Sequence, residues 1–298
     1  MATKITLNSS HLTENIGGAV VGTLSIAGLG SGTPTTPLAS LHLSSFDGSN
    51  GFRLYGVGSI DNSGYSVSNA GDVNGDGFDD VLIGAPHADP HGKSDAGEGY
   101  IVFGKASGWS PDLDLSSLDG TNGFRLNGVD ARDLSGTSVS SAGDVNGDGF
   151  DDVIIGASDA DPDYQSGYRE GASYVVFGKS SGFSSSLDLS SLDGSNGFRL
   201  DGVDIGDRSG ISVSSAGDVN GDGYSDVIIG ALSATPDGKS NAGESYVVFG
   251  KSSGFSASLD LSSLNGSNGF RLDGVDARDL SGTSVSSAGD VNGDGFDD

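Results

Sequence analysis

Oxygen-bearing side chains recur at fixed spacing in a nine-residue stretch that starts at Asp72 and is repeated three times further along the chain. In this first copy, Asp72, Asn74 and Asp76 occupy positions one, three and five, and Asp80 occupies position nine. Hard cations such as Ca²⁺ collect roughly six to eight oxygen ligands, which a tight loop can supply from alternate side chains and a backbone carbonyl. The spacing therefore predicts a calcium-binding loop.

The four copies have the same residues at positions one, three, five, six and nine, and the glycine at position six permits the sharp turn that such a loop needs. Position seven is expected to contribute its backbone carbonyl. We expect three to four bound Ca²⁺ ions, with the last loop weakest because the sequence stops at its ninth position. The predicted ligands are Asp72, Asn74, Asp76, Phe78 and Asp80; Asp144, Asn146, Asp148, Phe150 and Asp152; Asp218, Asn220, Asp222, Tyr224 and Asp226; and Asp290, Asn292, Asp294, Phe296 and Asp298.

Other interpretations of the loop are weaker. An EF-hand loop closes with Glu at position twelve, where this chain has Ile83 in the first copy. Zn²⁺ is disfavoured because no Cys or His takes part, and Mg²⁺ because it prefers few protein ligands. Position eight varies between Asp79 and Ser225, so it is not expected to be an essential ligand. A simple turn would explain the Asn-Gly and Asp-Gly pairs but not the Asp at position nine.

The composition restricts the class of partner and the compartment. The 298 residues include 41 acidic and 14 basic side chains, for a formal charge of -27, which makes nucleic acid an improbable partner. There is no Cys, so disulfide and thiol chemistry are excluded. No apolar stretch is long enough to span a membrane, and no signal peptide is visible. Because Ca²⁺ is abundant outside cells, calcium loops favour an extracellular or cell-surface location.

The loops need strands to hold them, and the flanking segments read as strands. Ser-Val-Ser precedes each loop and an apolar run such as Val153-Ile-Ile follows it, which predicts a strand buried on both faces. In the second copy, further strands are expected at 173–178 and 187–192. The loops start 72, 74 and 72 residues apart, and each unit has about four short strands and no helical periodicity. This predicts an all-β fold, a β-propeller with one blade per repeat.

The repeat also resembles a known family. The loop leads into Val81-Leu-Ile-Gly-Ala-Pro86, and Val102-Phe-Gly104 follows, as in the FG-GAP repeats of integrin α-subunit propellers and of bacterial surface proteins. The resemblance implies a β-propeller with one Ca²⁺ in each blade loop and no catalytic activity. It covers roughly residues 39–298, with units starting near Phe52, Phe124, Phe198 and Phe270, the last one incomplete.

Residues 1–38 are expected to form N-terminal strands and a linker, and Ile5 to Leu24 resembles the start of a cadherin-like module. Two explanations of the incomplete last unit remain open. The chain is a fragment, which we favour, or N-terminal strands at 5–7, 19–26 and 41–46 complete the last blade and close a small ring.

The sequence has no catalytic motif, so we expect no enzyme activity. His87 and His91 are expected in a solvated loop, and 133–137 in a turn before a strand. We expect a calcium-stabilised extracellular propeller for cell adhesion or protein interaction, binding a protein or glycan on a cell surface through the variable loops 87–98, 158–170 and 232–244. The alternatives are a carbohydrate-binding propeller, with Tyr164 and Tyr168 as candidate contacts, and an accessory domain of a larger secreted hydrolase.

Overall fold

The computed structural model describes residues 20–21, 42–161, 169–252 and 254–298. The described residues form short strands joined by turns and by single 3₁₀ turns. The strands are β1 (Val20–Val21), β2 (Arg53–Tyr55), β3 (Ser66–Gly71), β4 (Asp80–Ala85), β5 (Glu98–Val102), β6 (Asp112–Asp114), β7 (Gly123–Asn127), β8 (Ser138–Gly143), β9 (Asp152–Ala157), β10 (Ala172–Val176), β11 (Ser186–Asp188), β12 (Gly197–Asp201), β13 (Ser212–Gly217), β14 (Asp226–Ala231), β15 (Glu244–Val248), β16 (Ser258–Asp260) and β17 (Gly269–Asp273). The 3₁₀ turns are η1 (Leu43–Ser45), η2 (Pro90–Gly92), η3 (Leu115–Ser117), η4 (Leu189–Ser191), η5 (Pro236–Gly238) and η6 (Leu261–Ser263).

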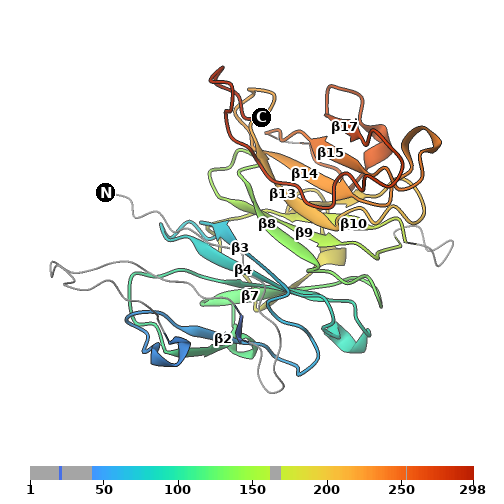
Figure 1. Ribbon diagram of the computed structural model, residues 1–298. Coiled ribbons are helices and arrows are strands. Elements are labelled where there is room, and N and C mark those ends of the chain that lie inside the picture. Colours follow the sequence, from blue (N-terminus) through green and yellow to red (C-terminus); the bar gives the residue numbers. More distant parts are fainter. Residues whose placement is uncertain (1–19, 22–41, 162–168, 253) are drawn as a thin grey trace.

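Three large sheets repeat one arrangement and follow one another in sequence order, from bottom to top in Figure 1. The first has the order β3-β4-β5-β7, the second β8-β9-β10-β12 and the third β13-β14-β15-β17, all antiparallel. The strands β3, β8 and β13 each form one edge of their sheet and lie beside one another. Four antiparallel strands in a radially repeated sheet are the blade of a propeller, so the predicted fold class is confirmed.

A short parallel strand links neighbouring sheets at their outer edges. After β10, the chain crosses to the first sheet, where β11 pairs with β7, and then returns to form β12 in its own sheet. The strand β16 pairs with β12 in the same way. The sequence predicts a continuous strand at 187–192, but the strand ends at Asp188 and Leu189–Ser191 form η4. The turn is needed because the chain must reverse from one sheet to the next.

The N-terminal sheet has the order β1-β2-β6 and lies at the end of the row opposite the third sheet (Figure 1). In it, β2 pairs antiparallel with β1 and parallel with β6, as β7 pairs with β5 and β11. Of the three N-terminal strands considered for ring closure, Val20–Val21 therefore pairs with the neighbouring β2, and Leu43–Ser45 forms η1. Residues 5–7 and most of the cadherin-like start lie outside the described residues.

The core lies between the sheets, so each central strand is buried on both faces. In β9, Val153 and Ile155 pack against the first sheet, whereas Ile154 packs against the third. All six residues of β9 are buried, as the apolar run predicted. A sheet that buries both faces must have a neighbour on each side, which is the physical basis of the repeat. Across the described part of the chain, no helix is long and apolar enough to cross a membrane.

Aromatic rings close the outer part of each interface. Trp109 stacks on Phe52, Phe183 on Phe124 and Phe255 on Phe198, with ring centroids 4.1, 4.2 and 4.7 Å apart. The second ring of each pair lies at the start of a repeat unit: Phe124 in β7, Phe198 in β12, and Phe52 directly before β2. These stacks connect β2, β7 and β12 to the segments that lead into the parallel outer strands.

Candidate metal centre

Three of the four predicted loops join the first two strands of a sheet, and they lie at the same end of the sheets. The first loop connects β3 to β4, the second β8 to β9, and the third β13 to β14. The fourth loop is closed by a backbone hydrogen bond of 3.0 Å from the N–H of Asp298 to the carbonyl of Gly289. All four loops are therefore turns between paired segments rather than loops between helices.

Within the first loop, the polar side chains accept hydrogen bonds from the backbone that they surround. The carboxylate of Asp72 accepts from the N–H groups of Asp76 (3.0 Å) and Gly77 (2.8 Å). The amide oxygen of Asn74 also accepts from Asp76, at 2.8 Å, and Asp76 accepts from Phe78 at 2.9 Å. These bonds hold positions one, three and five around a single turn, and each carboxylate retains further lone pairs.

The other three loops repeat these bonds. In each of them the Asp at position one accepts from the N–H groups of positions four, five and six, and the Asp at position five accepts from position seven. The turn requires positive φ at positions four and six, where Gly75 has φ 74° and Gly77 has φ 87°. Only glycine takes this conformation without strain, which explains why it occurs at both positions in all four copies.

The Asp at position nine begins the second strand of the hairpin, and its side chain is turned inward. Asp80 accepts from the N–H of Val73 at 3.1 Å and from the N–H of Gly104 at 2.8 Å. Asp152 and Asp226 make the same pair of contacts, each to the position-two N–H and to the glycine of the Phe-Gly sequence. Desolvation raises the pKa of Asp80 to about 7, of Asp152 to about 8 and of Asp226 to about 6, and the carboxylates at positions five and one add to the increase.

The backbone partner of position nine was not predicted from the sequence. The Val-Phe-Gly sequence recurs in each complete unit, with its glycine 24 or 26 residues after the Asp. That nearly constant separation was the available signal, but it gave no reason to connect the glycine with the Asp. The fourth loop has no such partner among the described residues, and Asp298 is exposed. Its carboxylate instead accepts from Val291 (2.9 Å) and Asn292 (3.3 Å) within the loop.

The structure thus brings together positions one, three and five, and it places position nine beside them but facing the interior. Among the described residues, no group of three or more His, Asp or Glu side chains is placed so that it could hold a metal ion together. A calcium ion in these loops therefore requires the carboxylates at positions one, five and nine to converge further. The donor set fits the ion in its chemistry, since it consists of carboxylate and amide oxygens only.

Position eight, which the sequence left without a role, joins neighbouring loops. The carboxylate of Asp151 in the second loop accepts from the backbone N–H of Asp72 in the first, and Asp297 in the fourth accepts from Asp218 in the third. Ser225 donates its backbone N–H to the carbonyl of Asp144 at 3.0 Å. Polar residues at position eight were the only signal of this contact in the sequence.

The aromatic residue at position seven covers the preceding loop. A Cβ on Gly75 would lie 2.3 Å from the ring of Phe150, and a Cβ on Gly147 would lie 2.3 Å from the ring of Tyr224. Two further backbone bonds accompany these contacts: Lys179 donates to the carbonyl of Val73, and Lys251 donates to that of Val145, both at 2.9 Å. Each of the first two loops is therefore fixed by the unit that follows it.

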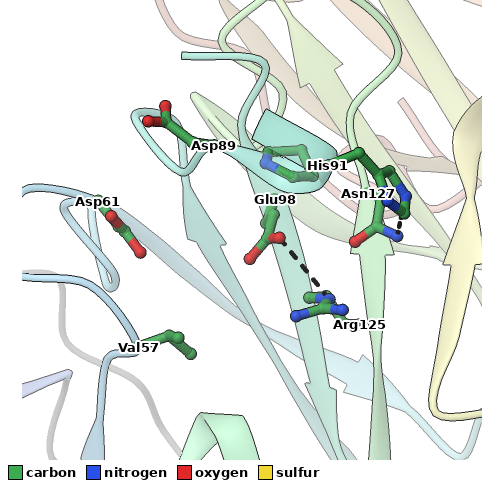
Figure 2. Close-up of a pocket in the computed structure, with 8 residues that line it drawn as sticks. Val57, Asp61, Asp89, His91, Glu98, Arg125 and Asn127 are labelled. Carbon is green, nitrogen blue, oxygen red and sulfur yellow. Dashed lines mark hydrogen bonds and ion pairs between the residues drawn. The ribbon is translucent and has the colours of Figure 1, made fainter. Parts of the chain in front are cut away.

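The opposite end of the sheets carries the variable loops and a polar pocket of about 250 Å³. Figure 2 shows Glu98 of β5 and Arg125 of β7 side by side, with Asp61 and Asp89 across from them. The Glu98 carboxylate lies 3.6 Å from the Arg125 guanidinium and accepts a hydrogen bond from Tyr100, and desolvation raises its pKa. The loop 87–98, predicted to bind a partner, thus lines a pocket.

The two histidines of that loop do not form a common site. His87 contacts Asp95 and His91 contacts Asp188, each at 3.0 Å, and the two histidine side chains are 41% and 58% exposed. The segment 133–137 is a turn before β8, closed by a 3.1 Å bond from Thr137 to the carbonyl of Leu134. Both outcomes agree with the sequence analysis. Residues 162–168, which include Tyr164 and Tyr168, lie outside the described residues.

Comparison with known proteins identifies the repeat. Residues 63–102, 135–176 and 209–248 match the FG-GAP repeat, and each match runs from the turn before a sheet's first strand to its third strand. The chain is similar to integrin alpha-4 of Xenopus laevis (33% identity over 167 residues, 55% of this chain and 14% of that protein). It is also similar to integrin alpha-PS2 of Drosophila melanogaster (31% over 175 residues, 57% of this chain and 11% of that protein) and to integrin alpha-5 of Xenopus laevis (31% over 173 residues, 57% and 14%).

The chain therefore carries FG-GAP repeats and is distantly homologous to integrin α subunits. The aligned region corresponds to about one seventh or less of the length of these relatives.

Proposed function

We propose that this chain is a non-catalytic propeller segment that works outside the cell in adhesion or protein interaction, with one structural Ca²⁺ in each blade loop. The observation that carries the proposal is the repeated loop geometry. Four loops hold the same side chains around the same hydrogen-bonded turn, and each carries three carboxylates within nine residues. A turn alone needs none of this charge, whereas a hard divalent cation uses all of it.

Calcium has a clear energetic role in this arrangement. Without a cation, the buried carboxylate at position nine is close to two others, and its pKa is raised well above that of a free Asp. A bound Ca²⁺ would hold these groups ionised and would neutralise part of their charge. It would also join the start of the second strand to the turn, so that binding contributes to folding.

The expected ligands are those predicted from the sequence. In the second loop they are Asp144, Asn146, Asp148, the carbonyl of Phe150, and Asp152. The position-eight residue is outside this set because its side chain is engaged by the preceding loop.

The partner-binding surface is expected at the end opposite the loops. The connections 87–98 and 232–244 lie there, as do the described ends of 158–170, and the connection of the second unit differs in sequence from the other two, whereas the calcium loops hardly differ. Surface loops held by a rigid scaffold are the usual place for binding. The homology to integrin α subunits supports an extracellular protein ligand.

A glycan is the second candidate partner, and the pocket in Figure 2 favours it. Asp61, Asp89 and Asn127 line this pocket with hydrogen-bond acceptors that suit hydroxyl groups. A glycan array probed with the whole chain tests this partner class, and an absence of bound glycans would reject it.

The test of the calcium proposal is isothermal titration of chelator-stripped protein with Ca²⁺, together with thermal melts with and without the ion. We expect one binding event for each of three or four loops and a higher melting temperature in Ca²⁺, because a ligand that binds only the folded state stabilises it. An unchanged melting temperature and no heat of binding would show that the loops are turns only.

A further inference from the structure

The residue at position eight of the second loop links that loop to the first. Asp151 lies in the chain between Phe150 and Asp152, which are both expected calcium ligands of the second loop. Its carboxylate accepts from the N–H of Asp72 at 2.8 Å, and its own N–H donates to the carbonyl of Asp72 at 3.3 Å. Asp72 is the first expected ligand of the first loop, so the second loop holds both polar backbone groups of that residue.

The junction between the second and third loops has the same contacts except for the charged one. The N–H of Ser225 donates to the carbonyl of Asp144 at 3.0 Å, as the N–H of Asp151 does at the first junction. The position-seven ring and the lysine after Phe-Gly also make equivalent contacts at both junctions. Among the described residues, only the backbone bond joins Ser225 to Asp144. The two junctions therefore differ mainly in the side chain at position eight.

The loops must rearrange when they bind an ion. In the described part of the chain, the carboxylates at positions one, five and nine do not form a group that could hold a metal ion together. Each loop thus has an open arrangement and a converged one, and the free energy of convergence lowers its affinity for the ion. A neighbouring loop that already orders position one reduces this cost, which produces positive cooperativity between the two sites.

We propose that Asp151 couples the first two loops, so that Ca²⁺ in one loop raises the Ca²⁺ affinity of the other. This coupling rests on the proposed function, because it requires Ca²⁺ in the loops. Convergence of the second loop fixes the Phe150 carbonyl and the Asp152 side chain, and therefore Asp151 between them. Asp151 in turn orders the backbone of Asp72. Coupling between two sites is reciprocal, so an ion in the first loop favours the second by the same factor.

The second and third loops should be coupled less strongly. Ser225 provides the backbone bond but no charged acceptor for the N–H of Asp144. A hydrogen bond to a charged group is stronger than one between neutral groups, so its absence leaves position one of the second loop less firmly held by its neighbour. The chain thus contains a strongly and a weakly coupled pair of otherwise similar loops.

Calcium titrations of chelator-stripped whole-chain variants measure the coupling. Replacing the position-five Asp with Asn removes one of the three carboxylates of a loop and should silence it, because the charge of the ligand set tunes Ca²⁺ affinity. Asp222→Asn with Asp294→Asn leaves the first two loops intact, and Asp76→Asn with Asp294→Asn leaves the second and third. Variants with three silenced loops give the affinity of each single loop. The coupling factor is the product of the two binding constants of a two-loop protein divided by the product of the two single-loop constants.

We expect a coupling factor of about 5 or more for the first two loops, which is the lower end of typical coupling between sites, and a smaller factor for the second and third. Two reciprocal substitutions isolate the side chain. Asp151→Ser should lower the factor of the first pair to that of the second pair, and Ser225→Asp should raise the factor of the second pair. Neither residue is an expected ligand, so each two-loop protein should still bind two ions.

The titrations separate a failure of the coupling from a failure of the calcium sites. Equal factors for the two pairs, or factors that the reciprocal substitutions leave unchanged, would overturn the role of Asp151 while the calcium sites remain. Loss of one ion in Asp151→Ser would also overturn it, because Asp151 would then be a ligand. An absence of binding heat in every protein would reject the proposed function, and the coupling with it.

Discussion

The Asp151 carboxylate of the second loop accepts a hydrogen bond of 2.8 Å from the backbone N–H of Asp72 in the first loop. The N–H of Asp151 in turn donates to the carbonyl of Asp72 at 3.3 Å. The two loops belong to different sheets, so this reciprocal pair fastens one blade to the next at the candidate calcium end. The loops are therefore connected in a row, and we expect a substitution in one loop to affect the stability of the neighbouring loop.

Replacing Asp151 with Ala should weaken the junction between the first two sheets. A partly buried hydrogen bond to a charged acceptor contributes about 1–2 kcal/mol, and its loss leaves the N–H of Asp72 without that partner. Asp151→Asn should retain most of the stability because an amide oxygen can still accept. Chemical denaturation of the three proteins measures the difference. Equal midpoints for the Ala and Asn variants would contradict the bridging role.

Replacing Asp152 with Asn should remove one calcium site, while Asp151→Asn should keep all sites. The two residues are adjacent, but Asp152 is fully buried beside positions one and five of its own loop, whereas Asp151 faces the preceding loop. Calorimetric titration should show one ion fewer for Asp152→Asn only. A loss of one ion in both variants would mean that position eight is a ligand after all.

Gly84 should tolerate no side chain, whereas Gly99 on the neighbouring strand should accept one. A Cβ on Gly84 would lie 2.1 Å from the carbonyl oxygen of Gly136 in the turn before β8, but a Cβ on Gly99 meets nothing closer than 3.5 Å. Neither glycine has positive φ, so the comparison isolates space from backbone strain. We expect Gly84→Ala to cost about 1–3 kcal/mol, typical of overpacking, and Gly99→Ala to have little effect. Thermal melts of both variants test this prediction. A similar loss of stability in both would refute the close approach of Gly84 to the carbonyl of Gly136.

Asp133, which lies at the end of the sheets opposite the calcium loops, should make the stability of the protein depend on pH. Burial raises its pKa to about 7, with Asp130 and Asp161 adding to the increase, while a hydrogen bond from Asp130 and the charge of Lys93 oppose it. The folded state therefore binds this proton more tightly than the unfolded state. The stability that Asp133 contributes through this raised pKa is fully present below the unfolded pKa of about 4. It is lost as the pH rises through about 7.

The variant Asp133→Asn should flatten this part of the pH profile. An Asn is neutral at every pH and can still accept the 3.0 Å bond from the N–H of Asp130. The free energy of unfolding, measured from pH 4 to pH 8 in chelator, should fall less in the variant by roughly 1–3 kcal/mol. Asp112→Asn, at an exposed position, is the control. Parallel profiles for Asp133→Asn and the unmodified chain would exclude this origin of the pH dependence.

The sequence by itself determined the repeat, the strands and the chemistry of the loops. Asn-Gly and Asp-Gly at fixed positions specify a tight turn, and alternating or continuous apolar residues specify strands, because both signals act between residues close in the chain. Val153-Ile-Ile was correctly predicted to be buried on both faces, since no other environment accommodates three consecutive large apolar residues in a strand. The oxygen-bearing side chains that surround each turn were likewise recognisable from residue types and spacing.

Only the tertiary structure determined which residues contact one another between repeat units. Asp151 reaches a loop 79 residues earlier, Gly84 faces the carbonyl of Gly136, and Phe124 opens a repeat in sequence but pairs with β5 of the preceding sheet. The inward turn of Asp80 toward Gly104 also depends on how β5 ends. These contacts join residues that no local period relates. They arise because each sheet must bury both faces against neighbours, and the geometry of that packing selects the partner of every side chain at the junction.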